Sequence, residues 1–278
     1  MTVTLLKRSF GRFIHSRAAL ALPVTFLILF VSTLSIISIT YAYSVERVNS
    51  QGQTLKVSTA KQNLLSLDEA VLSTVGQPGS SSTFDLTDSG GLTNIQPTAN
   101  VLTISINNAD IQETIFNASV GKVVYELPYS RSSQIGFYLK GDGRTVTNQS
   151  GASTSQLSIQ EGAEHPEVQL RYRPSVTYAA AGLENGKTVN NIRIYIVNLN
   201  SSAQIISQGE LPLQISCVNT QLTSKNYDVA SGSGNLAVTS VLDGESGSVS
   251  VPISSTPEGA VIHLEIVISN VSIQRWIR

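Results

Sequence analysis

The sequence predicts a mainly β protein with a long N-terminal α-helix: one membrane-spanning helix followed by an antiparallel β-sandwich. Three observations predict this fold class. An apolar run without charge extends from Ala18 to Tyr43, helical periodicity extends from Gln53 to Val75, and strand alternation begins at Thr83. The 278 residues are enough for a large buried core, and a single cysteine allows no disulfide within the chain.

Charge is scarce and unevenly placed. Charged residues are 13% of the chain, about half the usual share, and the formal net charge is -1. This composition excludes a strongly basic nucleic-acid binder, so no nucleic-acid partner is expected. Residues 1–17 form a basic leader that contains no acidic residue and has four basic ones: Lys7, Arg8, Arg12 and Arg17.

Residues 18–43 are predicted to be a transmembrane helix. These 26 residues contain no Asp, Glu, Lys or Arg, and as a helix they would extend about 39 Å against a hydrocarbon core of about 30 Å. Because the basic leader precedes them, the positive-inside rule places residues 1–17 in the cytoplasm and the chain after Tyr43 outside the cell membrane. The lipid bilayer is therefore an expected partner.

A cleaved secretory signal is the alternative interpretation of this segment. Thr40-Tyr41-Ala42 would then be the small-residue processing site, with Tyr43 as the first mature residue. Ordinary signal peptides have only about 7 to 15 apolar residues. The length of the apolar run therefore favours a helix that stays in the membrane.

Residues 44–75 are predicted to form an amphipathic helical stalk. Its apolar positions recur at helical spacing, and Asp68 and Glu69 are expected among the polar positions around them. The stripe is Val57, Ala60, Leu64, Leu67, Val71 and Val75. It requires a partner, either the chain's own outer domain or the same helix in neighbouring subunits. Gly76 and Pro78 end the helix, and residues 76–82 are predicted to be a linker.

Residues 83–278 are predicted to be an extracellular β-sandwich. Apolar and polar residues alternate in 102–106, 192–196 and 264–268, which gives each strand one buried face. Further expected strands are 122–127, 135–140, 168–172, 211–218, 236–242 and 249–253. Lys140-Gly141-Asp142-Gly143 and Asp243-Gly244 predict hairpin turns, and residues 182–188 are the best position for a division into two smaller sandwiches.

Residues that could carry chemistry are few and scattered. His165 lies near Glu164 and Glu167 in a polar loop, and His263 lies in a strand, but neither is part of a complete set of metal ligands, so no metal is expected. Cys217 lies in an apolar strand, as a small buried residue would. Since no nucleophile elbow or phosphate loop is present, we expect no catalytic residue, no cofactor and no enzyme activity.

Four sequons follow the apolar segment and make the chain a candidate glycoprotein. Their asparagines are Asn117, Asn148, Asn200 and Asn270. Such tripeptides arise by chance in a chain rich in Asn, Ser and Thr, so each marks only a candidate modification site on the expected outer side.

The basic leader, the apolar helix with an early Pro-Val, the amphipathic continuation and the β-rich head together resemble the type IV pilin superfamily, especially archaeal pilin-like proteins. The matching stretch is Arg17-Ala18-Ala19-Leu20-Ala21-Leu22-Pro23-Val24, in which Leu22 replaces the serine common in that family. The resemblance implies processing by a prepilin-type peptidase between Ala18 and Ala19. It also implies assembly with identical or related subunits through the N-terminal helix.

Three functional hypotheses remain. The first is a non-enzymatic pilin-like or adhesin-like surface protein, in which the size of the head suits a minor or tip subunit of a cell-surface filament. The second is a permanently anchored accessory or binding subunit of a cell-envelope complex, which the basic leader suits equally well. The third is an anchored hydrolase, which would require His165 or His263 to approach a nucleophile or carboxylates in a pocket.

Overall fold

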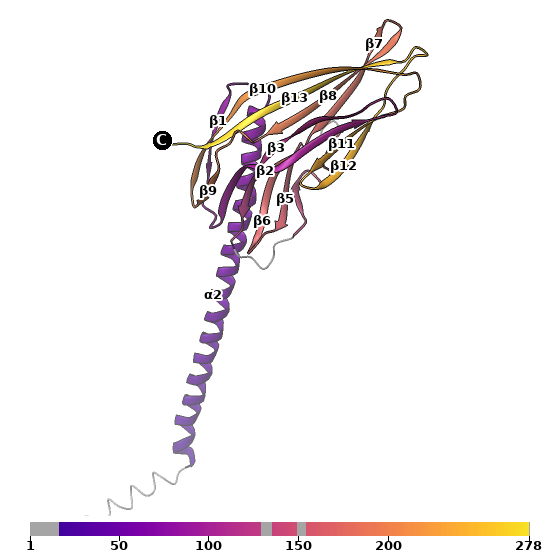
Figure 1. Ribbon diagram of the computed structural model, residues 1–278. Helices are drawn as coiled ribbons and strands as arrows, with labels where there is room; N and C mark the ends of the chain where they lie inside the picture. Colours follow the sequence, from indigo (N-terminus) through magenta and orange to yellow (C-terminus); the bar gives the residue numbers. More distant parts are fainter. Residues whose placement is uncertain (1–16, 129–134, 149–153, 278) are drawn as a thin grey trace, which may run out of the picture. The chain divides into compact units, whose positions relative to one another are not determined.

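One long helix precedes thirteen described strands in the computed structural model (Figure 1). The structure describes residues 17–128, 135–148 and 154–277, with side chains from Pro23 onward. The elements are α2 (Arg17–Thr74), β1 (Ser81–Leu86), β2 (Leu92–Asn107), β3 (Gln112–Glu126), β4 (Tyr138–Lys140), β5 (Ser155–Glu161), β6 (Pro166–Tyr172), β7 (Ser175–Glu184), β8 (Lys187–Asn198), β9 (Ile205–Gln208), β10 (Leu211–Val229), β11 (Leu236–Leu242), β12 (Glu245–Val251) and β13 (Ala260–Arg275). This is the predicted fold class.

The chain divides into two compact units, Met1–Gln53 and Thr54–Arg278, which we call the anchor and the head. Helix α2 is continuous over 58 residues and contributes to both units. The head therefore begins inside the stretch 44–75 that the sequence assigns to a stalk. The residues between Thr54 and Thr74 are part of the head's own fold.

The strands of the head form two sheets. The five-stranded sheet has the order β1-β10-β13-β8-β7, and the eight-stranded sheet has the order β12-β11-β2-β3-β6-β5-β4, with β9 paired to β2. All described pairs are antiparallel except β8 and β13, which are parallel. The prediction of an antiparallel sandwich is thus correct for most of the fold and wrong for this central pair.

The C-terminal part of α2 lies between the two sheets (Figure 1). Its residues Val57 to Val71 share one hydrophobic cluster, the helix core, with Leu213 and Ile273 of the five-stranded sheet and with Val123 and Leu170 of the eight-stranded sheet. Beyond the helix the two sheets pack directly on each other in a second cluster, the sheet core, which includes Ile104, Ile194 and Ile262.

The predicted apolar stripe faces the helix core. Ala60, Leu64, Leu67 and Val71 are completely buried, Val57 is buried, and Val75, just past the last helical residue, is partly buried against the same cluster. The partner of the stripe is thus the chain's own head, one of the two alternatives that the sequence left open. Burial of each leucine contributes about 1.5 to 3 kcal/mol.

The predicted turns and linkers are only partly correct. Asp243 and Gly244 both have positive φ in the tight turn between β11 and β12, as expected. The predicted hairpin at Lys140–Gly143 is wrong, because a longer loop joins β4 to β5 although Gly141 has positive φ. Residues 182–188 are a hairpin that joins β7 to β8, and the head continues through it as one unit.

Leu67→Ala tests whether the helix is an integral part of the head. Because Leu67 is completely buried in the helix core, the substitution should lower the free energy of unfolding of the head by about 2 to 5 kcal/mol. The measurement is thermal and urea unfolding of the full chain in detergent, followed by β-sheet circular dichroism. Leu55→Ala is the matched control, since Leu55 is 67% exposed on the same helix; equal effects of the two substitutions would contradict the packing.

Candidate functional site

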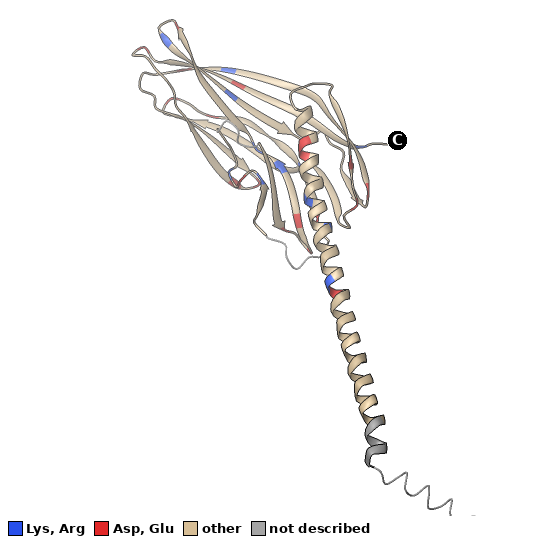
Figure 2. Cartoon of the chain, turned by 180° about the vertical axis from the view of Figure 1, so that it is seen from behind, with Lys and Arg blue, Asp and Glu red and all other residues tan. Residues whose placement is uncertain are grey.

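The anchor presents a helix with an exposed apolar surface. Every described side chain from Pro23 to Gln51 is exposed, among them Phe26 (71%) and Ile39 (70%). From Pro23 the first charges are Glu46 and Arg47, which Figure 2 shows as a coloured pair on an otherwise tan stretch of helix. By length and composition this helix can cross a membrane. Water is a poor solvent for such a surface, and a bilayer interior is a good one.

Two hydroxyl groups in the uncharged part of the anchor fit that environment. Thr33 Oγ1 donates to the carbonyl oxygen of Leu29 at 2.8 Å, and Ser35 Oγ donates to that of Val31 at 2.8 Å. Both hydroxyls are therefore satisfied within the helix, as hydrocarbon requires. Tyr41 and Tyr43 follow near the end of the uncharged run, and Arg47 Nη1 donates to Tyr43 Oη at 3.2 Å. Tyrosine followed by charge is typical of a membrane interface.

Asp68 is the polar centre of the helix core. Its carboxylate is completely buried and accepts hydrogen bonds from Tyr172 Oη at 2.9 Å and Ser155 Oγ at 3.0 Å, and Lys140 Nζ completes the set as an ion pair. Burial, together with the Asp68 charge and hydrogen bond, raises the pKa of Tyr172 well above its ordinary value. The prediction that Asp68 lies on the polar side of the stalk is wrong, because three donors from the eight-stranded sheet accommodate it in the core.

A second polar contact holds the helix nearer its entry into the head. Asn63 Nδ2 donates to the carbonyl oxygen of Thr87 at 2.9 Å, and Thr87 Oγ1 donates back to Asn63 Oδ1 at 3.0 Å. Asn63 and Asp68 thus fix the rotation and the height of the helix between the sheets, which apolar contacts alone specify poorly.

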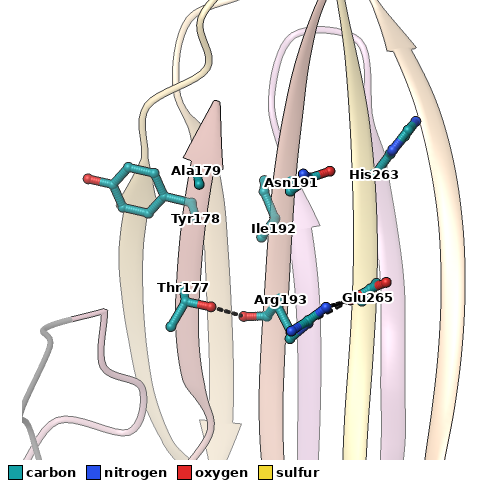
Figure 3. Close-up of a pocket in the computed structure, with 8 residues that line it drawn as sticks. All are labelled: Thr177, Tyr178, Ala179, Asn191, Ile192, Arg193, His263 and Glu265. Carbon is teal, nitrogen blue, oxygen red and sulfur yellow. Dashed lines mark hydrogen bonds and ion pairs between the residues drawn. The ribbon is translucent and has the colours of Figure 1, made fainter. Parts of the chain in front are cut away.

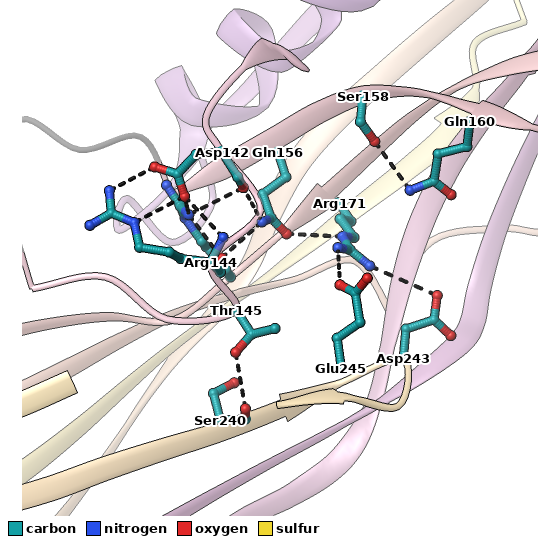
Figure 4. Close-up of polar contacts among 11 residues, drawn as sticks. Asp142, Arg144, Thr145, Gln156, Ser158, Gln160, Arg171, Ser240, Asp243 and Glu245 are labelled. Carbon is teal, nitrogen blue, oxygen red and sulfur yellow. Dashed lines mark hydrogen bonds and ion pairs between the residues drawn. The ribbon is translucent and has the colours of Figure 1, made fainter. Parts of the chain in front are cut away.

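Two buried arginines on and beside β6 hold the loops of the eight-stranded sheet (Figure 4). Arg173 is 1% exposed and binds Asp142 and the carbonyl oxygen of Arg144, and hydrogen bonds from Arg144 and Arg173 lower the pKa of Asp142. Arg171 donates to Gln156 Oε1 and to Glu245 Oε2, both at 2.9 Å. Arg173 holds the loop around Asp142, and Arg171 holds the start of β12 and joins β6 to β5 through Gln156, so these contacts stabilise the fold.

A groove of about 400 Å³ lies on the outer face of the five-stranded sheet (Figure 3). Arg193 Nε donates to Glu265 Oε2 at 2.6 Å across its floor, and Thr177 Oγ1 donates to the carbonyl oxygen of Arg193 at 3.4 Å. His263 lines the groove, and its Nε2 lies 3.7 Å from Glu184 Oε2. The imidazole and the hydroxyl therefore have separate partners in this groove.

His165 lies in the polar loop between β5 and β6, as expected, and is partly buried there. Its ring and the carboxylates of Glu126 and Glu164 place ligand atoms within 4.8 Å of one another, so these three residues could hold a cation. Glu126 and Glu167 are also direct cross-strand partners of β3 and β6. Burial raises the pKa of Glu167, Lys122 opposes the shift, and the like charge of Glu126 adds to it.

Comparison with known proteins identifies no relative. The chain matches no family model, no curated protein and no solved structure. Its function is therefore argued from its own geometry: an exposed apolar helix, a head built on the continuation of that helix, and a polar groove.

The remaining predicted site residues occupy different environments. Asn117 and Asn200 are exposed, whereas Asn270 is buried and its Nδ2 donates to Asn219 Oδ1 at 2.6 Å, so a glycan on Asn270 would have to break this contact. Asn148 is partly exposed, and the rest of its sequon lies outside the described residues. Ala18 and Ala19 are helical, with side chains outside the described part. Cys217 is buried in β10, as expected.

Sequence reasoning missed the most connected polar residue of the helix, although one signal was present. Asp68 follows Leu64 by four residues and precedes Val71 by three, so it lies on the apolar stripe rather than opposite it. A carboxylate in that position requires buried donors. No such signal exists for Arg173 or Asp142, whose loops meet only in the folded sheet.

Asp68→Asn tests the polar centre of the helix core. The amide keeps the shape but leaves Lys140 without its counter-charge and Tyr172 with a weaker acceptor, and breaking a buried pair of this kind costs about 3 kcal/mol. Urea unfolding of the full chain in detergent measures the decrease in stability. Glu69→Gln, at the exposed neighbouring position, is the control, and a decrease at Asp68 no larger than at Glu69 would show that the network contributes nothing.

Glu167→Gln tests the cross-strand pair of like charges. Folding raises the pKa of this carboxyl, so the protonated group stabilises the folded state at pH values below its pKa in the unfolded chain. This contribution to the free energy of unfolding is lost as the pH rises through the pKa of the folded state. The glutamine variant should therefore be more stable than the parent at pH 7 by about 0.2 to 1 kcal/mol, and the difference should vanish near pH 4. Thermal unfolding across this pH range measures it, with Glu161→Gln as the control; a destabilised variant at pH 7 would contradict the repulsion.

Proposed function

We propose that the chain is a non-enzymatic, membrane-anchored surface protein, pilin-like or adhesin-like, that assembles with identical or related subunits through its N-terminal helix. One observation carries the proposal. A single helix is exposed and apolar over the anchor, and within the head it is buried as part of the hydrophobic core. Such a helix joins an outer domain to a hydrophobic environment without an intervening loop.

The anchor surface suits two hydrophobic environments. In a bilayer its exposed Leu, Ile, Val and Phe side chains contact lipid; in a filament equivalent helices would replace the lipid around the same side chains, so the surface stays in apolar surroundings. The resemblance of Arg17–Val24 to the pilin processing region supports the filament. In this proposal the head faces the outside, and its wet, weakly charged surface meets other subunits or a target.

A permanently anchored accessory or binding subunit of an envelope complex is the second candidate. Four basic residues in the first 17 favour it, because a retained cluster of positive charge holds the N-terminus on the cytoplasmic side. The two candidates differ in the mature N-terminus and in whether the protein leaves the membrane.

The deciding measurement is the intact mass and the N-terminal peptide of the protein from its native host, together with a filament-shearing fraction. A mature terminus at Ala19 and recovery in sheared filaments are expected for a pilin-like subunit. A terminus that retains Lys7 to Arg17, with all of the protein in the membrane fraction, would overturn assembly and leave the fixed anchor.

Membrane insertion itself is tested by Phe30→Arg combined with Leu34→Arg. Each arginine near the centre of the helix costs about 2.5 to 3.5 kcal/mol for insertion, so the variant should be released by alkaline carbonate whereas the parent stays in the pellet. Phe30→Leu combined with Leu34→Ile is the matched control and should be retained. Equal retention of the arginine variant would contradict a membrane-spanning anchor.

A further inference from the structure

The five-stranded sheet has two open edges. On one side, Thr147 forms a bridge with Ser175 at the start of β7, but in the described part of the chain β7 pairs only with β8 from Thr177 onward, and all eight residues from Thr177 to Glu184 are exposed. On the other side, β1 pairs with β10 only up to Ser216, so the edge of β10 from Val218 to Val229 has no described strand beside it. Unpaired backbone groups along such edges are templates for a further strand.

Neither edge carries the usual protection over its whole length. Charged side chains, above all lysine, and proline normally block strand addition. Residues 218–224 of β10 contain no charge, no proline and no glycine, and expose Val218 (54%) and Leu222 (61%). Residues 177–180 of β7 are also uncharged, and the strand is interrupted only further on, by a register shift after Ala180 and a positive φ at Gly182.

The two edges share a continuous run of open rows only over residues 224–227 of β10 and 177–180 of β7, and Lys225 is the one charged residue of these two edge segments. Pairing aligns Ser224 with Glu265, Glu265 with Arg193, and Arg193 with Thr177. Three residues further along each edge strand, Tyr227 of β10 and Ala180 of β7 also lie in one row. Tyr227 pairs with Ile262, Ile262 with Asn190, and Asn190 with Ala180. Strands β7 and β10 are each antiparallel to the parallel pair β8 and β13, so both edge strands run in the same direction.

We propose that these edges join neighbouring copies of this chain, with β7 of one head pairing in parallel with β10 of the next. The occupant is a second copy because each head supplies both halves of the contact at matching rows and in matching direction. The inference rests on the proposed function, since anchoring in one membrane gives the copies a common orientation and raises their effective concentration. The contact is heterologous, so it adds one head after another.

The charges around the edges permit this pairing. Lys225 of β10 is paired with Glu113, Asp228 with Lys187, and Glu184 of β7 lies near His263. Each of these described edge charges therefore has its partner within its own head and requires none from the next copy. The flat part of β7 is only four residues long, which gives a weak contact that depends on the concentration of heads at the surface.

Cross-linking between differently tagged full-length chains tests the pairing in membranes. One chain carries Thr177→Cys and the other Ser224→Cys, both with the native buried cysteine removed by Cys217→Ala. Directly opposed residues of paired strands fall within the Cα separation of about 4.4 to 6.8 Å that a disulfide requires. Mild copper-catalysed oxidation should give a dimer that contains both tags, and a chain with both cysteines should give trimers and larger species.

Controls separate edge pairing from crowding and from failure of the anchor. Thr177→Cys mixed with Ser201→Cys, an exposed position in a turn away from both edges, should give no mixed dimer. Ala179→Lys should abolish the cross-link, whereas Val101→Lys on an inner strand should leave it. Retention of the protein in the membrane pellet after alkaline carbonate is measured on the same sample and tests the anchor. If the protein is retained but no mixed dimer forms, edge pairing is overturned and the membrane anchor is not. Dimers of Thr177→Cys with itself would also overturn it, in favour of a symmetric contact.

Discussion

The structure of the head depends on how the apolar space between its two sheets is filled. At one end the sheets pack directly on each other; at the other they are separated by the diameter of a helix, and residues Val57 to Val71 fill the space. Strand residues on both sides, such as Ile273 and Leu170, belong to the same hydrophobic cluster as the helix. A head without these helical turns would expose one end of its core to water. The anchor and the head therefore share a structural element, and the helix is more than a tether.

Apolar filling explains why the helix is there, and polar contacts explain why it has one position. Apolar side chains of suitable size can pack in more than one arrangement, so hydrophobic burial alone does not select a single position for the helix. The carboxylate of Asp68 has three donors in one place, and Asn63 forms a reciprocal pair with Thr87. Any other rotation would leave a buried charge without partners, and that cost exceeds any improvement in apolar packing. The buried Arg171 and Arg173 do the same for the loops of the eight-stranded sheet.

Hydrophobic periodicity within short segments predicted most of the helix and strands. The remaining elements depend on contacts between residues that are far apart in the sequence. The helix and the strands 102–106, 192–196 and 264–268 have one buried face each, so their periodicity is visible in the sequence. Strand β7 has no such pattern because it is exposed on both faces beyond Val176, and β1, β5 and β9 are short or rich in Ser and Gln. The parallel pairing of β8 with β13 joins residues about 70 positions apart, which no local signal encodes. For the same reason the neighbours of His165 and Asp142 emerged only from the fold.

The position of β13 has a consequence for the order in which the chain acquires its structure. This strand, Ala260–Arg275, is the last of the described strands along the chain, yet it is the middle strand of the five-stranded sheet and separates β10 from β8. Until it arrives, β7 and β8 have no connection to β1 and β10, and the helix core lacks Val271 and Ile273. The head therefore cannot be completed until β13 has been synthesised, and the emerging chain has to be kept from aggregating until then. A chain truncated before β13 would lose the centre of the five-stranded sheet and with it the link between its two halves.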